Sequence, residues 1–88
     1  MQNPRDKFYS ELVKIIQSNL LPDILGWMAL HSQSVILNYG EDNRLWECSW
    51  IVSSGNRFTS VEKSPLEATK SVLAKVRTEI LFNTMDKK

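Results

Sequence analysis

The chain has 88 residues, of which 42% are hydrophobic and 24% are charged, and its formal net charge is +1. These values are typical of one globular domain with a modest core, and the low charge argues against a protein held to its partner mainly by phosphates. A single cysteine excludes an internal disulfide bond, and with a single histidine it offers too few ligands for a zinc site within one chain. We expect one domain over residues 1–88, in the cytoplasm and without membrane contact, because neither a signal pattern nor an apolar run of about 18 residues is present.

The first predicted element is a helix over residues 4–20. Asn3 and Pro4 suit its N-cap and its first helical position. Apolar residues then recur at helical spacing, namely Phe8, Leu12, Ile15, Ile16 and Leu20. Pro22 should stop the helix, because the residue before a proline avoids the helical conformation.

Residues 21–33 allow two interpretations. The first is a short helix that Asp23 caps and that ends at Leu30, and the second is an irregular apolar connector. Gly26 disfavours the helix, because glycine costs about 1 kcal/mol relative to alanine in a helix interior. With either interpretation we expect Trp27 and Leu30 in the core, because apolar residues this dense rarely stay in water.

Three strands are predicted next, over residues 34–39, 45–52 and 57–63. They contain β-branched and aromatic residues, and polar turns with glycine and asparagine separate them. The even positions of the second strand form one apolar face, which comprises Trp46, Cys48, Trp50 and Val52. We expect this face to meet the helices.

The last predicted element is a helix over residues 65–82, followed by a frayed tail over residues 83–88. Ser64 and Glu67 have the spacing of a capping box, and Pro65 takes the first helical position. The expected buried stripe consists of Leu66, Thr69, Val72, Leu73, Val76 and Ile80. The whole order predicts an α+β fold of two layers, α-β-β-β-α, with a three-stranded antiparallel sheet that carries two helices on one face.

Three features occur together in the second half of the chain: Trp46-Glu47-Cys48 in a strand, Phe58 in the next strand, and a helix start at Ser64-Pro65-Leu66-Glu67-Ala68. This combination resembles the phage alpha/beta sandwich domain, a family of small phage and prophage proteins. The resemblance implies a small accessory protein and supplies no biochemical activity.

The α-β-β-β-α order is also similar to that of the double-stranded-RNA-binding domain. That family binds phosphates with a lysine cluster at the start of its last helix, and of the matching positions here Lys70 alone is basic. Its Gly-Pro-x-His loop is replaced by Gly40-Glu41-Asp42-Asn43, which carries two acids. Both departures argue against RNA binding.

The residue pattern offers no catalytic, cofactor or metal site, and we expect a protein that is not an enzyme. His31 has no carboxylate, serine or cysteine placed beside it by local spacing, so we interpret it as an ordinary polar or capping histidine. Cys48 lies between two tryptophans on the expected core face, where a thiol is buried and inert. Glu41 and Asp42 are interpreted as a solvated turn.

The outer face of the sheet is the first candidate binding surface. Ile36, Leu45 and Ile51 are expected to point away from the helices. Phe58 joins them if the hairpin loop has two or four residues, whereas a three-residue loop turns Phe58 inward. Such an apolar patch marks a protein partner or a homodimer, unless residues 21–33 fold over it and cover it.

The second candidate surface is a basic strip of Lys63, Lys70 and Arg77, together with Arg57, which two glutamates of the last helix interrupt. The sequence therefore favours a non-enzymatic binding module that acts through a protein–protein surface. Its partner-binding residues would be Ile36, Leu45, Ile51 and Phe58 for apolar contact, with Lys63, Lys70 and Arg77 for charge complementarity. The phage resemblance implies an accessory or inhibitor protein, and the alternative is nucleic-acid binding by the basic strip.

Overall fold

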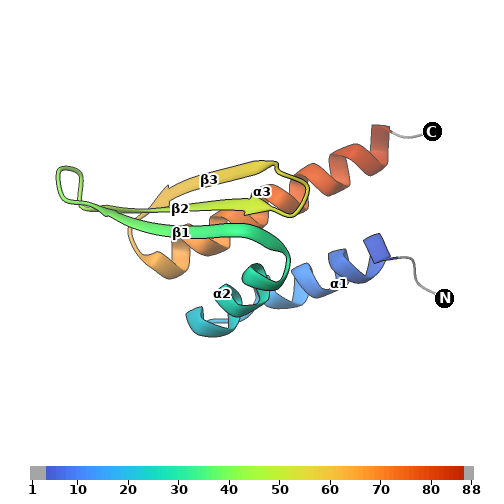
Figure 1. Ribbon diagram of the computed structural model, residues 1–88, viewed down its shortest axis with the longest axis horizontal. Coiled ribbons are helices and arrows are strands. Elements are labelled where there is room, and N and C mark those ends of the chain that lie inside the picture. Colours follow the sequence, from blue (N-terminus) through green and yellow to red (C-terminus); the bar gives the residue numbers. More distant parts are fainter. Residues whose placement is uncertain (1–3, 87–88) are drawn as a thin grey trace.

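The computed structural model describes the backbone of residues 4–86 and the side chains of residues 6–81. Its elements are α1 (Pro4–Ile16), α2 (Leu21–Leu30), β1 (Ser32–Gly40), β2 (Leu45–Val52), β3 (Arg57–Glu62) and α3 (Pro65–Asp86). The strands form one antiparallel sheet in the order β1-β2-β3 (Figure 1). The predicted α+β fold is confirmed, with α2 as an additional helix.

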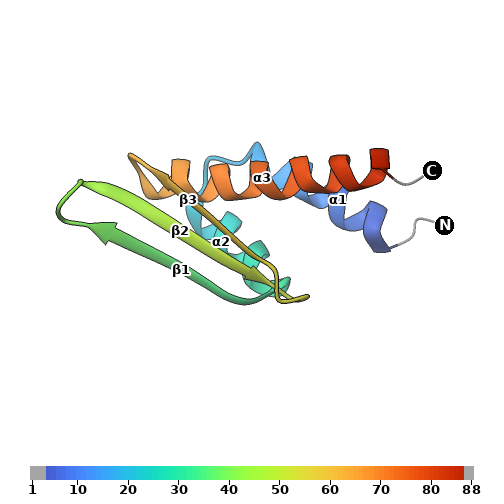
Figure 2. The ribbon, with the colours of Figure 1, turned by 90° about the horizontal axis from the view of Figure 1, so that it is seen from above.

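The helices lie together on one side of the sheet (Figure 2). Helix α2 packs beside β1, and α3 packs across β2 and β3. The helices that pack on the strands are therefore α2 and α3, and α1 packs mainly on these two helices.

The core is built around the even positions of β2, as predicted. Cys48 and Trp50 are fully buried, and Trp46 and Val52 pack against them partly buried. The helices contribute Leu12 from α1, Ile24 and Met28 from α2, and Ala68, Thr69, Val72, Leu73 and Val76 from α3. The predicted stripe of the last helix is confirmed, with its two end members, Leu66 and Ile80, partly buried.

Helix α1 ends at Ile16, earlier than the predicted limit at residue 20. The N–H groups of Gln17 and Ser18 bond three residues back, to the carbonyls of Lys14 and Ile15 at 3.2 and 3.0 Å. This tighter turn closes the helix, and Ser18 Oγ then accepts the Leu20 N–H at 3.1 Å. The predicted N-cap, residue 3, lies outside the described residues.

The segment that the sequence left open forms a helix, α2, which begins at Leu21 and not after Asp23. Gly26 is exposed, and a side chain added there would meet no atom within 4 Å. Trp27 packs against the core as expected, but the placement of Leu30 in the core is wrong, because its side chain is 80% exposed. Leu30 follows the buried Met28 by two residues, which turns it about 200° around the helix axis.

The remaining boundaries differ from the prediction by a few residues. Strand β1 is longer than residues 34–39, β3 ends at Glu62, and α3 continues to Asp86 through part of the expected frayed tail. Residues 87–88 of that tail lie outside the described residues. The predicted cap of the last helix is confirmed, because Ser64 Oγ accepts the Glu67 N–H at 3.1 Å.

Candidate functional site

The hairpin between β2 and β3 decides which face of the sheet carries Phe58. The Val52 N–H donates to the Asn56 carbonyl at 2.9 Å, so three residues form the loop and Trp50 pairs with Phe58. Phe58 therefore shares the inner face with Trp50 and packs partly buried against the core. The three-residue alternative is the correct one, and the outward placement of Phe58 is wrong.

The other three predicted apolar residues do lie on the outer face. Ile36 is 40% exposed, and Leu45 and Ile51 are half-buried. Residues 21–33 leave this face uncovered, since α2 packs on the inner side with Ile24 and Met28 in the core. The patch is discontinuous, because Ser49 of β2 lies opposite Ile36.

Val61, which the sequence analysis did not single out, is 44% exposed on the outer face of β3. It pairs with Glu47 of β2, which shares its face.

The predicted basic residues do not gather into one strip. Arg57 begins β3 and Lys63 follows its other end, about 20 Å away at strand spacing. Lys70 Nζ donates to Asn19 Oδ1, in the segment between α1 and α2, at 3.2 Å. Arg77 lies seven residues after Lys70 on the same side of α3 and is half-buried.

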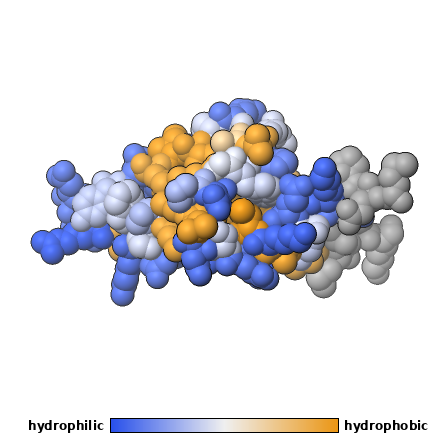
Figure 3. Space-filling model, turned by 90° about the horizontal axis from the view of Figure 1, so that it is seen from below, coloured by the Kyte–Doolittle hydropathy of each residue, from blue (hydrophilic) through white to orange (hydrophobic). Residues whose placement is uncertain are grey.

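A second apolar surface is formed by the exposed side of α2 and the free edge of β1, and we call it the α2–β1 surface. Its most exposed apolar side chains are Leu30 (80%), Leu20 (62%) and Tyr39 (48%), and Ile36 (40%) borders it on the outer face of the sheet. Hydrophobic residues gather across the middle of the face that α2 and β1 present (Figure 3). A sequence signal for it existed, since between Lys14 and Glu41 Asp23 is the sole residue with a formal charge.

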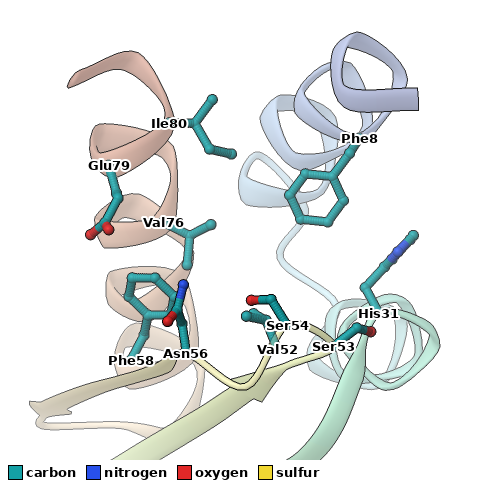
Figure 4. Close-up of a pocket in the computed structure, with 10 residues that line it drawn as sticks. All are labelled: Phe8, His31, Val52, Ser53, Ser54, Asn56, Phe58, Val76, Glu79 and Ile80. Carbon is teal, nitrogen blue, oxygen red and sulfur yellow. The ribbon is translucent and has the colours of Figure 1, made fainter. Parts of the chain in front are cut away.

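A cavity of about 450 Å³ opens where α1, α3 and the loop after β2 meet (Figure 4). Its apolar walls are Phe8 from α1, Val76 and Ile80 from α3, and Val52 and Phe58 from the sheet. His31, Ser53, Ser54, Asn56 and Glu79 add polar groups around it. The cavity has the size and the mixed lining of a small-ligand site, but its polar groups lie mostly on exposed loop and helix positions.

Next to this cavity, α1 and α2 are joined by Glu11, Trp27 and His31. Glu11 Oε1 accepts the Trp27 Nε1–H at 2.9 Å and lies 3.7 Å from His31 Nε2. The hydrogen bond from Trp27 is the main cause that lowers the pKa of Glu11 below its ordinary value. Phe8 completes a ring cluster, 5.2 Å from Trp27 and 5.1 Å from His31 between centroids.

This cluster has structural roles that account for its members. His31 is the C-cap residue of α2, and its N–H donates to the Met28 carbonyl at 3.0 Å. His31 thus holds a capping position through its backbone, and a carboxylate that is distant in sequence, that of Glu11, lies beside its imidazole. Cys48 is fully buried, as expected, and this burial raises the pKa of its thiol. In the described part of the chain, no three His, Cys, Asp or Glu residues converge as metal ligands.

The chain matches no protein-family model, no curated protein and no solved structure. Within residues 4–86 no helix combines the length and the apolar run that crossing a membrane requires. The resemblance to the phage alpha/beta sandwich domain stays a prediction.

Proposed function

We propose that this chain is a non-enzymatic binding module that recognises another protein, or its own copy, through the α2–β1 surface. The observation that supports the proposal best is the exposure of Leu30 and Leu20 on a segment whose single formal charge is Asp23. Scattered exposed leucines are ordinary, but an exposed apolar surface with one charged residue, Asp23, is typical of an interaction site. Ile36 of the outer face borders this surface and adds to the same contact.

The cellular setting follows from the resemblance alone. If the likeness to small phage proteins holds, the module acts as an accessory or inhibitor protein of a phage or another mobile element. Nucleic-acid binding is less favoured, because Arg57 and Lys63 are separated along β3 and Lys70 is engaged with Asn19.

The test compares the immobilised wild-type protein with Leu30→Asp in about 0.1 M and about 1 M salt. We expect the wild type to retain its protein partner at both concentrations, because apolar contacts survive screening, and Leu30→Asp to lose it. Leu81→Asp is the matched control, since Leu81 is an exposed leucine on α3 (45%), and it should retain the partner. The proposal would be overturned if the protein bound no protein partner but bound duplex RNA in a complex that dissociates at the higher salt concentration.

A further inference from the structure

The two edges of the sheet differ in how they are protected. Strand β3 has six residues, carries Arg57 and Glu62, and its Thr59 carbonyl accepts a hydrogen bond from Lys75 Nζ of α3. Strand β1 has nine residues and contains neither a charged residue nor a proline. Proteins usually block edge strands with lysine, proline or a covering element, because an open edge pairs with other chains. The β3 edge carries such protection, whereas β1 has one register shift at its start, between Ser32 and Ser34, and is unprotected over residues 34–40.

The backbone groups that point out of the β1 edge belong to its odd residues. Along β2, the Val52 N–H points to β3, where Asn56 accepts it, and the next N–H, of Ser53, points to the β1 side, where His31 accepts it. Antiparallel ladders alternate in this way, so the even residues of β1 bond to β2. The N–H and carbonyl groups of Val35, Leu37 and Tyr39 therefore face away from the sheet.

Helix α2 lies directly beside this open edge (Figure 1). Its buried side holds Ile24 and Met28 in the core, while Leu30 stays 80% exposed next to the start of β1. A strand added to β1 would lie close to α2. Pairing at this edge would thus satisfy backbone groups and cover Ile36, which lies at the centre of β1 and is 40% exposed.

A second copy of the chain fits this edge electrostatically. In a two-fold antiparallel contact residue i of one β1 faces residue j of the other, and j faces i, so like charges on β1 would be brought close together across the contact. The nine residues of β1 are all uncharged, which removes this repulsion.

We propose that two copies pair antiparallel through their β1 edges, about a two-fold axis at Ile36, and form a continuous six-stranded sheet. In this register Ile36 lies opposite the partner's Ile36, and Val35 exchanges backbone hydrogen bonds with the partner's Leu37. The pair at Ile36 is the non-hydrogen-bonded kind, which brings its side chains closest. This inference rests on the proposed function and names its partner as the chain itself.

The first test measures molar mass by light scattering over a range of protein concentrations. We expect the wild type to approach twice the mass of one chain, and Ile36→Lys to weaken the association at least about tenfold. Val61→Lys is the matched control, because Val61 has similar exposure (44% against 40%) on the same face but on the protected edge. It should dimerise like the wild type.

A mixing experiment tests the symmetry. Ile36→Lys and Ile36→Glu should each be monomeric alone, and an equal mixture should dimerise, because the lysine then lies opposite a glutamate. The same mixture of Val61→Lys and Val61→Glu should behave no differently from its components. Failure of the Ile36 mixture to dimerise would overturn the paired register.

Hydrogen exchange of the wild type gives a test that needs no variant. The amides of Val35, Leu37 and Tyr39 should become more protected as protein concentration rises, because only pairing with another strand gives them acceptors. A monomer at every concentration, unchanged exchange at these amides, or equal disruption by Ile36→Lys and Val61→Lys would each overturn the inference. A monomer that still captures a different protein through Leu30 would leave the proposed function standing.

Discussion

Helices α2 and α3 both pack against the sheet, but their outward sides differ in chemistry. Helix α3 buries Val72 and Leu73 and presents charged and polar residues to water, among them Glu67, Lys75 and Glu79. Helix α2 buries Ile24 and Met28 and presents Pro22, Gly26, Ala29 and Leu30, with Asp23 as its one charged residue. The sequence of α3 is therefore explained by the fold of one chain, whereas the apolar outward side of α2 is what the proposed contact with a partner would use.

The buried sides of the two helices should contribute similarly to the free energy of unfolding. Truncating a side chain there has the largest effect that we expect. Met28→Ala on α2 and Leu73→Ala on α3 should each lower the free energy of unfolding by about 2–5 kcal/mol, because both side chains are fully buried and leave a cavity. Urea unfolding followed by tryptophan fluorescence measures both. A negligible cost for Met28→Ala beside a large cost for Leu73→Ala would mean that α2 rests loosely on the sheet.

The starts of the two helices sharpen the comparison. Ser64 caps α3 with its hydroxyl, whereas Leu20 precedes α2 without a side-chain cap. Ser64→Ala should therefore cost about 0.5–2 kcal/mol of stability. Thr78→Ala, at an exposed position within α3, is the control and should not destabilise the protein in the same urea measurement.

Local patterns were sufficient to predict most of the fold. The period-two alternation around Trp50 fixed the inner face of β2, and the Ser64 capping box fixed the start of α3. Periodicity could not predict which side of α2 is buried, because α2 has one charged residue, Asp23, and so no polar side that marks the solvent. The density of apolar residues there predicts Leu30 in the core, although it is the most exposed of the large apolar side chains described.

The candidate site was less predictable than the fold, because it depends on contacts between distant residues. Glu11 and Trp27 are 16 positions apart, and no local sequence pattern predicts a hydrogen bond between them. The face of the sheet on which Phe58 lies depends on the length of the loop before β3, because one residue more or fewer in that loop moves Phe58 to the other face. The uncharged run that forms β1 was visible in the sequence, but that β1 is an edge strand follows from the order of the sheet.

The bond between Glu11 and Trp27 is a third way to probe α2, through its attachment to α1. The folded pKa of Glu11 lies below its ordinary value of 4.5, so this group stabilises the fold above pH 4.5 and loses that contribution as the pH falls through the folded pKa. We expect Glu11→Gln, which cannot titrate, to lose less stability than the wild type on acidification. Urea titrations at several pH values below 5 measure this difference. If both proteins lost the same stability on acidification, Glu11 would not be the source of the acid-sensitive contribution.

The smallest effect is expected on the outward side of α2, and it is the most informative one. Leu30→Ala removes the same kind of side chain as Met28→Ala, two residues further along the same helix, but from a position that is 80% exposed. In dilute protein the free energy of unfolding should change by less than about 0.5 kcal/mol. In concentrated protein the cost should grow, because a partner that binds only the folded chain stabilises the wild type by mass action. A large cost already in dilute protein would mean that one chain buries Leu30 by itself, and the α2–β1 surface would then not be available to any partner.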